Sequence, residues 1–70
     1  MNAQVIRIDV VEVPNGWLVT DSRAPAQRYL SSAGALAAAK AIAQRLRRDG
    51  HEVEVYLSRD GQEQKVAIEP

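Results

Sequence analysis

The sequence predicts an α+β fold, a two-layer sandwich in which one helix packs on one face of a mostly antiparallel sheet of 4-5 strands. Residues 31–50 have the period of an amphipathic helix, and segments rich in β-branched residues lie on both sides of it. The turn sequences Asn15-Gly16 and Asp60-Gly61 each separate two strand-like segments, which indicates two hairpins. We therefore expect the order β-β-(β)-α-β-β within a single domain, residues 1–70.

Residues 4–13 form the first expected strand, because apolar and polar side chains alternate along it. One face carries Ile6, Ile8 and Val10. The alternation slips at Val10-Val11, and Val11 and Val13 continue on the opposite face. Either a β-bulge near this point restores the phase, or both faces of the strand are partly covered, as at a dimer interface.

Residues 17–21 form the second expected strand, with Trp17 and Val19 on one face. Residues 22–26 are expected to be a loop, because Pro25 is incompatible with a central strand. Residues 27–30 could form a short third strand before the helix.

Residues 31–50 form the expected helix. At about 100° per residue, six apolar side chains fall in one arc, namely Ala35, Leu36, Ala39, Ile42, Ala43 and Leu46. The alanines let a helix lie close to a sheet. Ser31 or Ser32 can act as the N-cap, and Gly50 suits the position just beyond the helix. Gly34 is unfavourable inside a helix, and close approach to a strand would explain it.

Two further strands are expected after the helix, at residues 51–58 and 62–69. In the first, Val53, Val55 and Leu57 point inward, and in the second Val66 and Ile68 do so. Glu52, Glu54 and Tyr56 therefore share the outward face of their strand.

Composition limits the classes of function. The chain of 70 residues has no cysteine and a formal net charge of zero, so disulfide and thiolate chemistry are excluded. No segment has the length of a membrane span, and the N-terminus does not resemble a signal peptide, so we expect a cytoplasmic protein. A core this small is marginal alone, which makes a homodimer a reasonable expectation.

Several short motifs resemble one known family. They are Val10-Val11, Gly16-Trp17-Leu18-Val19, Arg28-Tyr29-Leu30-Ser31, the helix alanines Ala35 and Ala39, and Asp60-Gly61. Together they are similar to the small bacterial domain-of-unknown-function family 2188. The chain departs from that pattern in having fewer Lys and Thr residues and a longer first strand. The resemblance implies a fold and gives no catalytic residues to transfer.

The candidates for chemistry are weak. His51 is the only histidine, and its neighbour Glu52 points to the opposite face of a strand, so the two cannot chelate one metal together. Glu52 and Glu54 share a face, but acid–base catalysis also needs a cleft that shifts one pKa. Charged strand residues of this kind more often protect a sheet edge. We therefore expect no enzyme activity, no cofactor and no metal.

Charge is unevenly distributed along the chain. Residues 32–50 hold four basic residues and one acidic residue, whereas residues 51–70 hold two basic and five acidic residues. The expected partner-binding candidates are the helix residues Lys40, Gln44, Arg45, Arg47 and Arg48, the acidic strand residues Glu52 and Glu54, and the aromatic residues Trp17 and Tyr56. The aromatic rings could stack on bases, although a tryptophan beside a hairpin turn is more often a core residue.

Three functions are compatible with these features. The first is a non-catalytic protein-interaction or regulatory module, with a protein or a second copy as partner, which uses a sheet edge or the basic helix and acidic hairpin. The second is a nucleic-acid-binding module that uses the helix cations, although binders of this size are usually strongly basic. The third is a small inhibitor from a phage or other mobile element, because some anti-CRISPR proteins have a similar size and element order.

Overall fold

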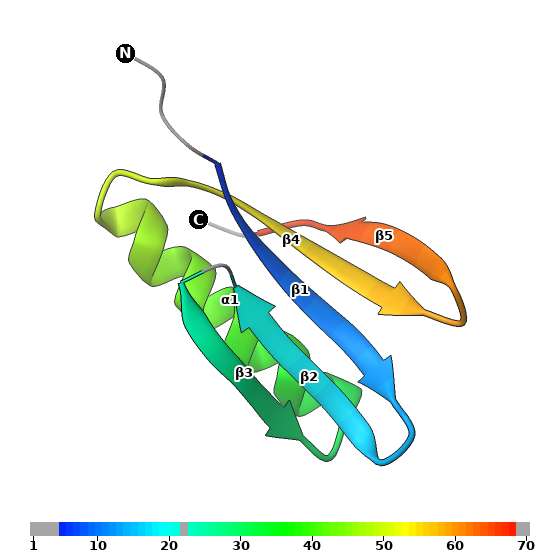
Figure 1. Cartoon of the computed structure of the whole chain (residues 1–70). Helices are drawn as coiled ribbons and strands as arrows, with labels where there is room; N and C mark the ends of the chain where they lie inside the picture. The colour runs from blue at the N-terminus through cyan, green and yellow to red at the C-terminus, as the bar shows by residue number, and fades with distance from the viewer. Residues whose placement is uncertain (1–4, 22, 69–70) are drawn as a thin grey trace.

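A computed structural model describes residues 5–21 and 23–68. It contains five strands and one helix, which are β1 (Val5–Val13), β2 (Gly16–Asp21), β3 (Ala24–Tyr29), α1 (Ser32–Arg48), β4 (Glu52–Arg59) and β5 (Gln62–Val66). The strands form one sheet in the order β3-β2-β1-β4-β5 (Figure 1). Only β1 and β4 are parallel, and the other neighbouring pairs are antiparallel. The predicted α+β class and mostly antiparallel sheet are confirmed.

Helix α1 begins and ends close to its predicted limits. Ser31 is the N-cap, and its hydroxyl oxygen accepts a hydrogen bond from the backbone N–H of Gly34 at 3.0 Å. Asp49 is the C-cap, and Gly50 follows with φ +92°, a conformation that glycine adopts without a steric penalty. A side chain at Gly34 would first meet the Ser31 hydroxyl, 3.2 Å from the Cβ position. The N-cap, more than a neighbouring strand, therefore explains this glycine.

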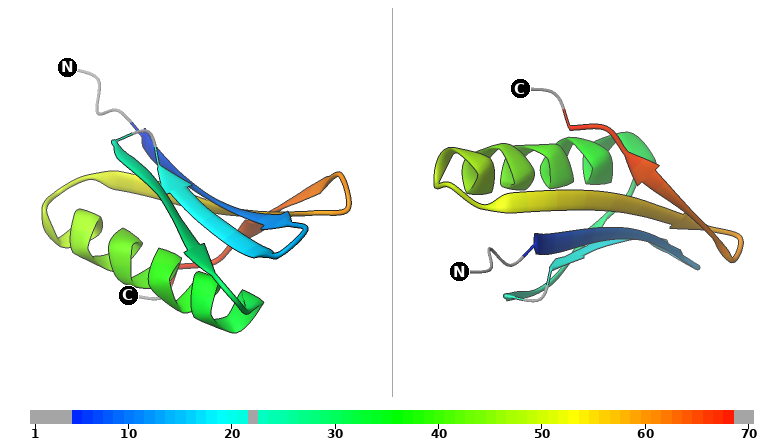
Figure 2. Two further views of the ribbon diagram at one scale, coloured as in Figure 1. Left: turned by 60° about the horizontal axis from the view of Figure 1, so that its bottom comes forward. Right: turned by 90° about the horizontal axis from the view of Figure 1, so that it is seen from above.

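The core lies where α1 packs against β1, β2, β3 and β4 (Figure 2). Ala35, Ala39 and Ala43 are fully buried, as are Ile8 and Val10 of β1. Small side chains on the helix permit this close contact with the sheet. Burying branched strand residues against them stabilises the fold by about 25 cal/mol for each Å² of apolar surface that is removed from water.

Strand β1 contains no β-bulge, so that prediction is wrong. Its pairing with β2 runs without a break from Ile8 to Val13, and its pairing with β4 runs without a break from Val5 to Val11. Val10 therefore faces the helix, while Val11 and Val13 lie half-buried on the face opposite the helix. The slip in the pattern reflects apolar residues on both faces, the second possibility raised above.

Strand β3 begins earlier than predicted and includes Pro25. Proline is tolerated here because β3 is an edge strand, so one side of its backbone has no neighbouring strand. The only register shift in the described pairings lies between β2 and β3, at Val19 and Asp21.

Both predicted hairpins are present. In the β4–β5 hairpin, Asp60 and Gly61 have φ 52° and 75°, as a type I′ turn requires. In the β1–β2 hairpin, Val13 pairs with Gly16, so Pro14 and Asn15 form the loop and Gly16 is the first residue of β2. Asn15-Gly16 is therefore not the central pair of the turn.

Gly16 is required for a separate reason. Its φ is +144°, and a Cβ at this position would overlap the backbone carbonyl oxygen of Tyr29 in β3. Glycine thus allows the end of β3 to approach β2.

Small differences remain at the other strand limits. Strand β4 begins at Glu52, so His51 precedes it, and β5 ends at Val66. The predicted strand residues Gln4 and Glu69 lie outside the described residues. Nothing in the described part of the chain forms a helix with the length and apolar character needed to cross a bilayer.

Candidate interaction surfaces

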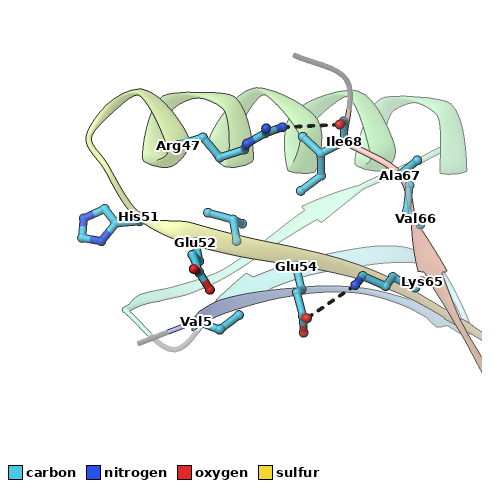
Figure 3. A pocket seen from close by; sticks show the side chains of 10 residues that line it. Val5, Arg47, His51, Glu52, Glu54, Lys65, Val66, Ala67 and Ile68 are labelled. Carbon is cyan, nitrogen blue, oxygen red and sulfur yellow. Dashed lines mark hydrogen bonds and ion pairs between the residues drawn. The ribbon is translucent and has the colours of Figure 1, made fainter. Parts of the chain in front are cut away.

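One side of helix α1 carries most of its predicted binding residues. We define the basic flank as Lys40, Gln44, Arg47 and Arg48, which follow one another at helical spacing beside the buried alanines. The Arg47 guanidinium donates a hydrogen bond to the carbonyl oxygen of Ile68 at 3.4 Å (Figure 3). Because Ile68 lies just beyond β5, the basic flank is on the β5 side of the helix.

Arg45 is separated from the basic flank. Its position falls on the other side of the helix, and it lines a shallow hollow with Asp21, Arg23 and Asp49 at the end of β2. The helix cations therefore do not form a single face.

Two acidic residues of the β4–β5 hairpin, Glu54 and Glu63, are paired with cations within the chain. The Glu63 carboxylate pairs with the Arg7 guanidinium. The Glu54 carboxylate accepts a hydrogen bond from the Tyr56 hydroxyl at 3.1 Å and lies 3.5 Å from the Lys65 ammonium. Glu54 and Tyr56 thus share a face, as predicted, but their polar groups are already used.

The helix cations have a different environment. Among residues 5–21 and 23–68, no ion pair involves Lys40, Arg45 or Arg48. Glu54 and Glu63 of the hairpin are therefore compensated by ion pairs, whereas Lys40, Arg45 and Arg48 of the helix are not compensated within the described residues.

Arg7 is a residue that the sequence analysis did not identify. Its guanidinium lies over the Tyr56 ring, 4.0 Å from the centroid, and its Nε donates to the Asp9 carboxylate at 2.9 Å. The hydrogen bond with Asp9 is the main cause of the raised pKa of Arg7. Together with the Glu63 pair, these contacts connect β1, β4 and β5 on the sheet face opposite the helix. Only the parallel β1–β4 pairing brings these residues together, so no local pattern could reveal them.

Trp17 is part of the hydrophobic core. Its side chain is 7% exposed, and the Arg59 guanidinium covers the ring at 5.2 Å from the centroid. Glu12 approaches Arg59 at 4.0 Å. The interpretation of Trp17 as a core residue is therefore confirmed, and partner binding by this residue stays a prediction.

The surroundings of His51 do not form a metal site. His51 and Glu52 line an open hollow between the end of α1 and the start of β4, and their side chains point apart (Figure 3). Within the described ranges, no group of three His, Cys, Asp or Glu side chains could hold a metal ion.

The two edge strands of the sheet, β5 and β3, differ in how readily another strand could pair with them. Along β5, the side chains of the first four residues are exposed, and the fifth, Val66, is half-buried against the core. Strand β3 carries Pro25, and its Arg28 guanidinium donates to the carbonyl oxygen of Asn15 at 2.7 Å. Thus β5 is a proline-free edge, whereas β3 contains a proline near its start.

The chain gives no match to a family model, to a curated protein or to a solved structure. The similarity to the domain-of-unknown-function family 2188 stays a prediction that rests on the short motifs given above.

Proposed function

We propose that this chain is a non-catalytic protein-interaction module that binds its partner by main-chain pairing along the β5 edge. The proposal treats the domain as two layers, with the helix on one face of the sheet and β5 at its margin. The observation that carries it is the exposed, proline-free edge of β5, since unpaired N–H and C=O groups of an edge strand are a template for another strand.

The distribution of polar side chains also favours binding over catalysis. Catalytic acids and bases usually depend on burial to shift their pKa. No polar or charged side chain is buried among the described residues. The polar groups therefore lie where they can contact a partner surface.

A peptide-binding experiment tests this proposal. The isotope-labelled protein is panned against a random peptide library, and selected peptides are titrated while backbone amide shifts are recorded. We expect extended peptides to perturb the amides of Glu63 and Lys65 most strongly. Perturbations confined to the helix, or peptide binding that survives Lys65→Pro, would contradict the use of the β5 edge.

A second candidate function, nucleic-acid binding, is favoured by the uncompensated cations of α1. Within the described residues Lys40 and Arg48 have no acidic partner, and the Arg47 guanidinium donates to a backbone carbonyl. Such cations can contact phosphates at a sequence-independent surface.

Fluorescence anisotropy with labelled DNA and RNA distinguishes the two functions. Phosphate-driven binding should weaken steeply between about 50 and 200 mM salt. Arg48→Glu should abolish it, whereas Arg45→Glu, on the other side of the helix, is the matched control. No binding at the lower salt concentration would remove this second function.

A further inference from the structure

The exposed edge of β5 has a charge pattern that is complementary to itself. Glu63 and Lys65 lie on the same face of the sheet, one residue before and one residue after Gln64. Their side chains are 51% and 63% exposed. When two such strands run antiparallel about Gln64, Glu63 of each copy lies directly opposite Lys65 of the other.

The backbone of β5 allows this same register. Because Asp60 and Gly61 form a two-residue turn, Arg59 and Gln62 are a hydrogen-bonded pair, and such pairs then alternate along the hairpin. The backbone groups of Gln62 and Gln64 therefore point toward β4, and those of Glu63 and Lys65 point outward from the edge. Two copies can thus exchange both hydrogen bonds between Glu63 and Lys65.

The neighbouring registers are disfavoured by charge. Pairing centred on Glu63 would place two carboxylates opposite each other, and pairing centred on Lys65 would place two ammonium groups opposite each other. Like charges in directly opposed strand positions are destabilising. Charge therefore selects the register centred on Gln64.

We infer that the partner of the β5 edge is a second copy of this chain, paired antiparallel about Gln64 so that both sheets become one. The inference rests on the proposed function, because it names the partner of the same edge. Two intrachain pairs, Arg7–Glu63 and Glu54–Lys65 (the second drawn in Figure 3), would then join into a continuous row of alternating charge across both copies. A two-fold axis perpendicular to the sheet keeps both helices on one side, so the basic flank of each copy borders the joint.

Charge reversal tests the inference by sedimentation velocity on the full chain. The wild type should dimerise reversibly with concentration. Glu63→Lys or Lys65→Glu alone should weaken the dimer at least ten-fold, because each places like charges opposite each other. An equimolar mixture of the two variants should regain the wild-type dimer as a heterodimer, since every opposed pair then has opposite sign.

The equimolar mixture distinguishes an effect on the dimer interface from an effect on the folding of each copy. Each single variant also disturbs an intrachain pair, but loss of an intrachain pair would not be restored by mixing. A wild type that remains monomeric at about 1 mM, where even weak association is detectable, would overturn the inference. Single reversals that leave the dimer intact, or a mixture that stays monomeric, would also overturn it. If the wild type is monomeric and selected peptides still bind β5, the proposed function stands and self-association alone fails.

Discussion

Strands β3 and β5 are the two edge strands of one sheet, and they differ in the features that limit pairing with another chain. Strand β3 contains Pro25, which cannot donate a backbone hydrogen bond, and its far end is fixed against β2 by the close approach at Gly16. Strand β5 has no proline and presents Glu63 and Lys65 outward, one on each side of Gln64. A small domain with two open edges would be prone to aggregate. A proline on β3 and charged residues on β5 both limit unspecific pairing of these edges.

Charge on an edge strand need not be only protective. A lysine on an edge usually discourages pairing, because an apolar strand cannot compensate it. On β5 the lysine is accompanied by a glutamate two residues away, so a strand with the same sequence compensates both charges. This charge pattern disfavours pairing with strands of other sequences and favours pairing with a second β5 strand. Specific interfaces commonly combine attraction and repulsion in this way.

The largest effect on stability is expected at the β3 margin. Gly16→Ala should lower the free energy of unfolding by about 3 kcal/mol, because the new Cβ would overlap the Tyr29 carbonyl oxygen and neither backbone can easily move. The control Gly61→Ala also has a positive φ but no atom within 4 Å, so it should lose only about 1 kcal/mol. Urea denaturation measures both values. Equal losses would show that β3 does not depend on this contact.

Transferring a proline to the other margin should remove the difference between the edges. Lys65→Pro deletes an outward N–H that β4 does not use, so the dimer should be lost at a stability cost of about 1 kcal/mol. Gln64→Pro deletes an inward N–H and should cost about 2 kcal/mol more, because a β4 carbonyl loses its partner. Sedimentation and urea denaturation of both variants give the two quantities. A dimer that persists in Lys65→Pro would place the contact elsewhere.

Features that depend on a few neighbouring residues could be predicted from the sequence. An N-cap at Ser31 or Ser32, a glycine after the helix and the Asp60-Gly61 turn were predicted from local residue preferences. The structure has the N-cap at Ser31 and confirms the other two. It was wrong about Pro25, because a proline that is excluded from a central strand is acceptable at an edge, and strand order is not visible in the chain.

The candidate site was less predictable, because it depends on contacts between distant segments. The parallel pairing of β1 with β4 brings Arg7 beside Tyr56 and Glu63, and no period or motif encodes that pairing. The acidic hairpin was therefore expected to attract a partner, whereas Glu54 and Glu63 are already paired within the chain. The β5 pattern itself was present in the sequence, but its meaning depends on β5 being at the margin of the sheet.

The smallest effect is expected at Arg59, which precedes the turn leading into β5. Its guanidinium covers the Trp17 ring and approaches Glu12, but its side chain is 54% exposed. Arg59→Ala should therefore cost only about 0.5 kcal/mol, the value typical of an exposed cation–π contact. Removing the cover should also expose the Trp17 ring, so tryptophan fluorescence should shift to longer wavelength and be quenched more easily by iodide. Because the β5 edge does not include Arg59, the dimer should keep its dissociation constant. A dimer weakened by this variant would mean that self-association involves the helix-facing side of the hairpin as well as its backbone edge.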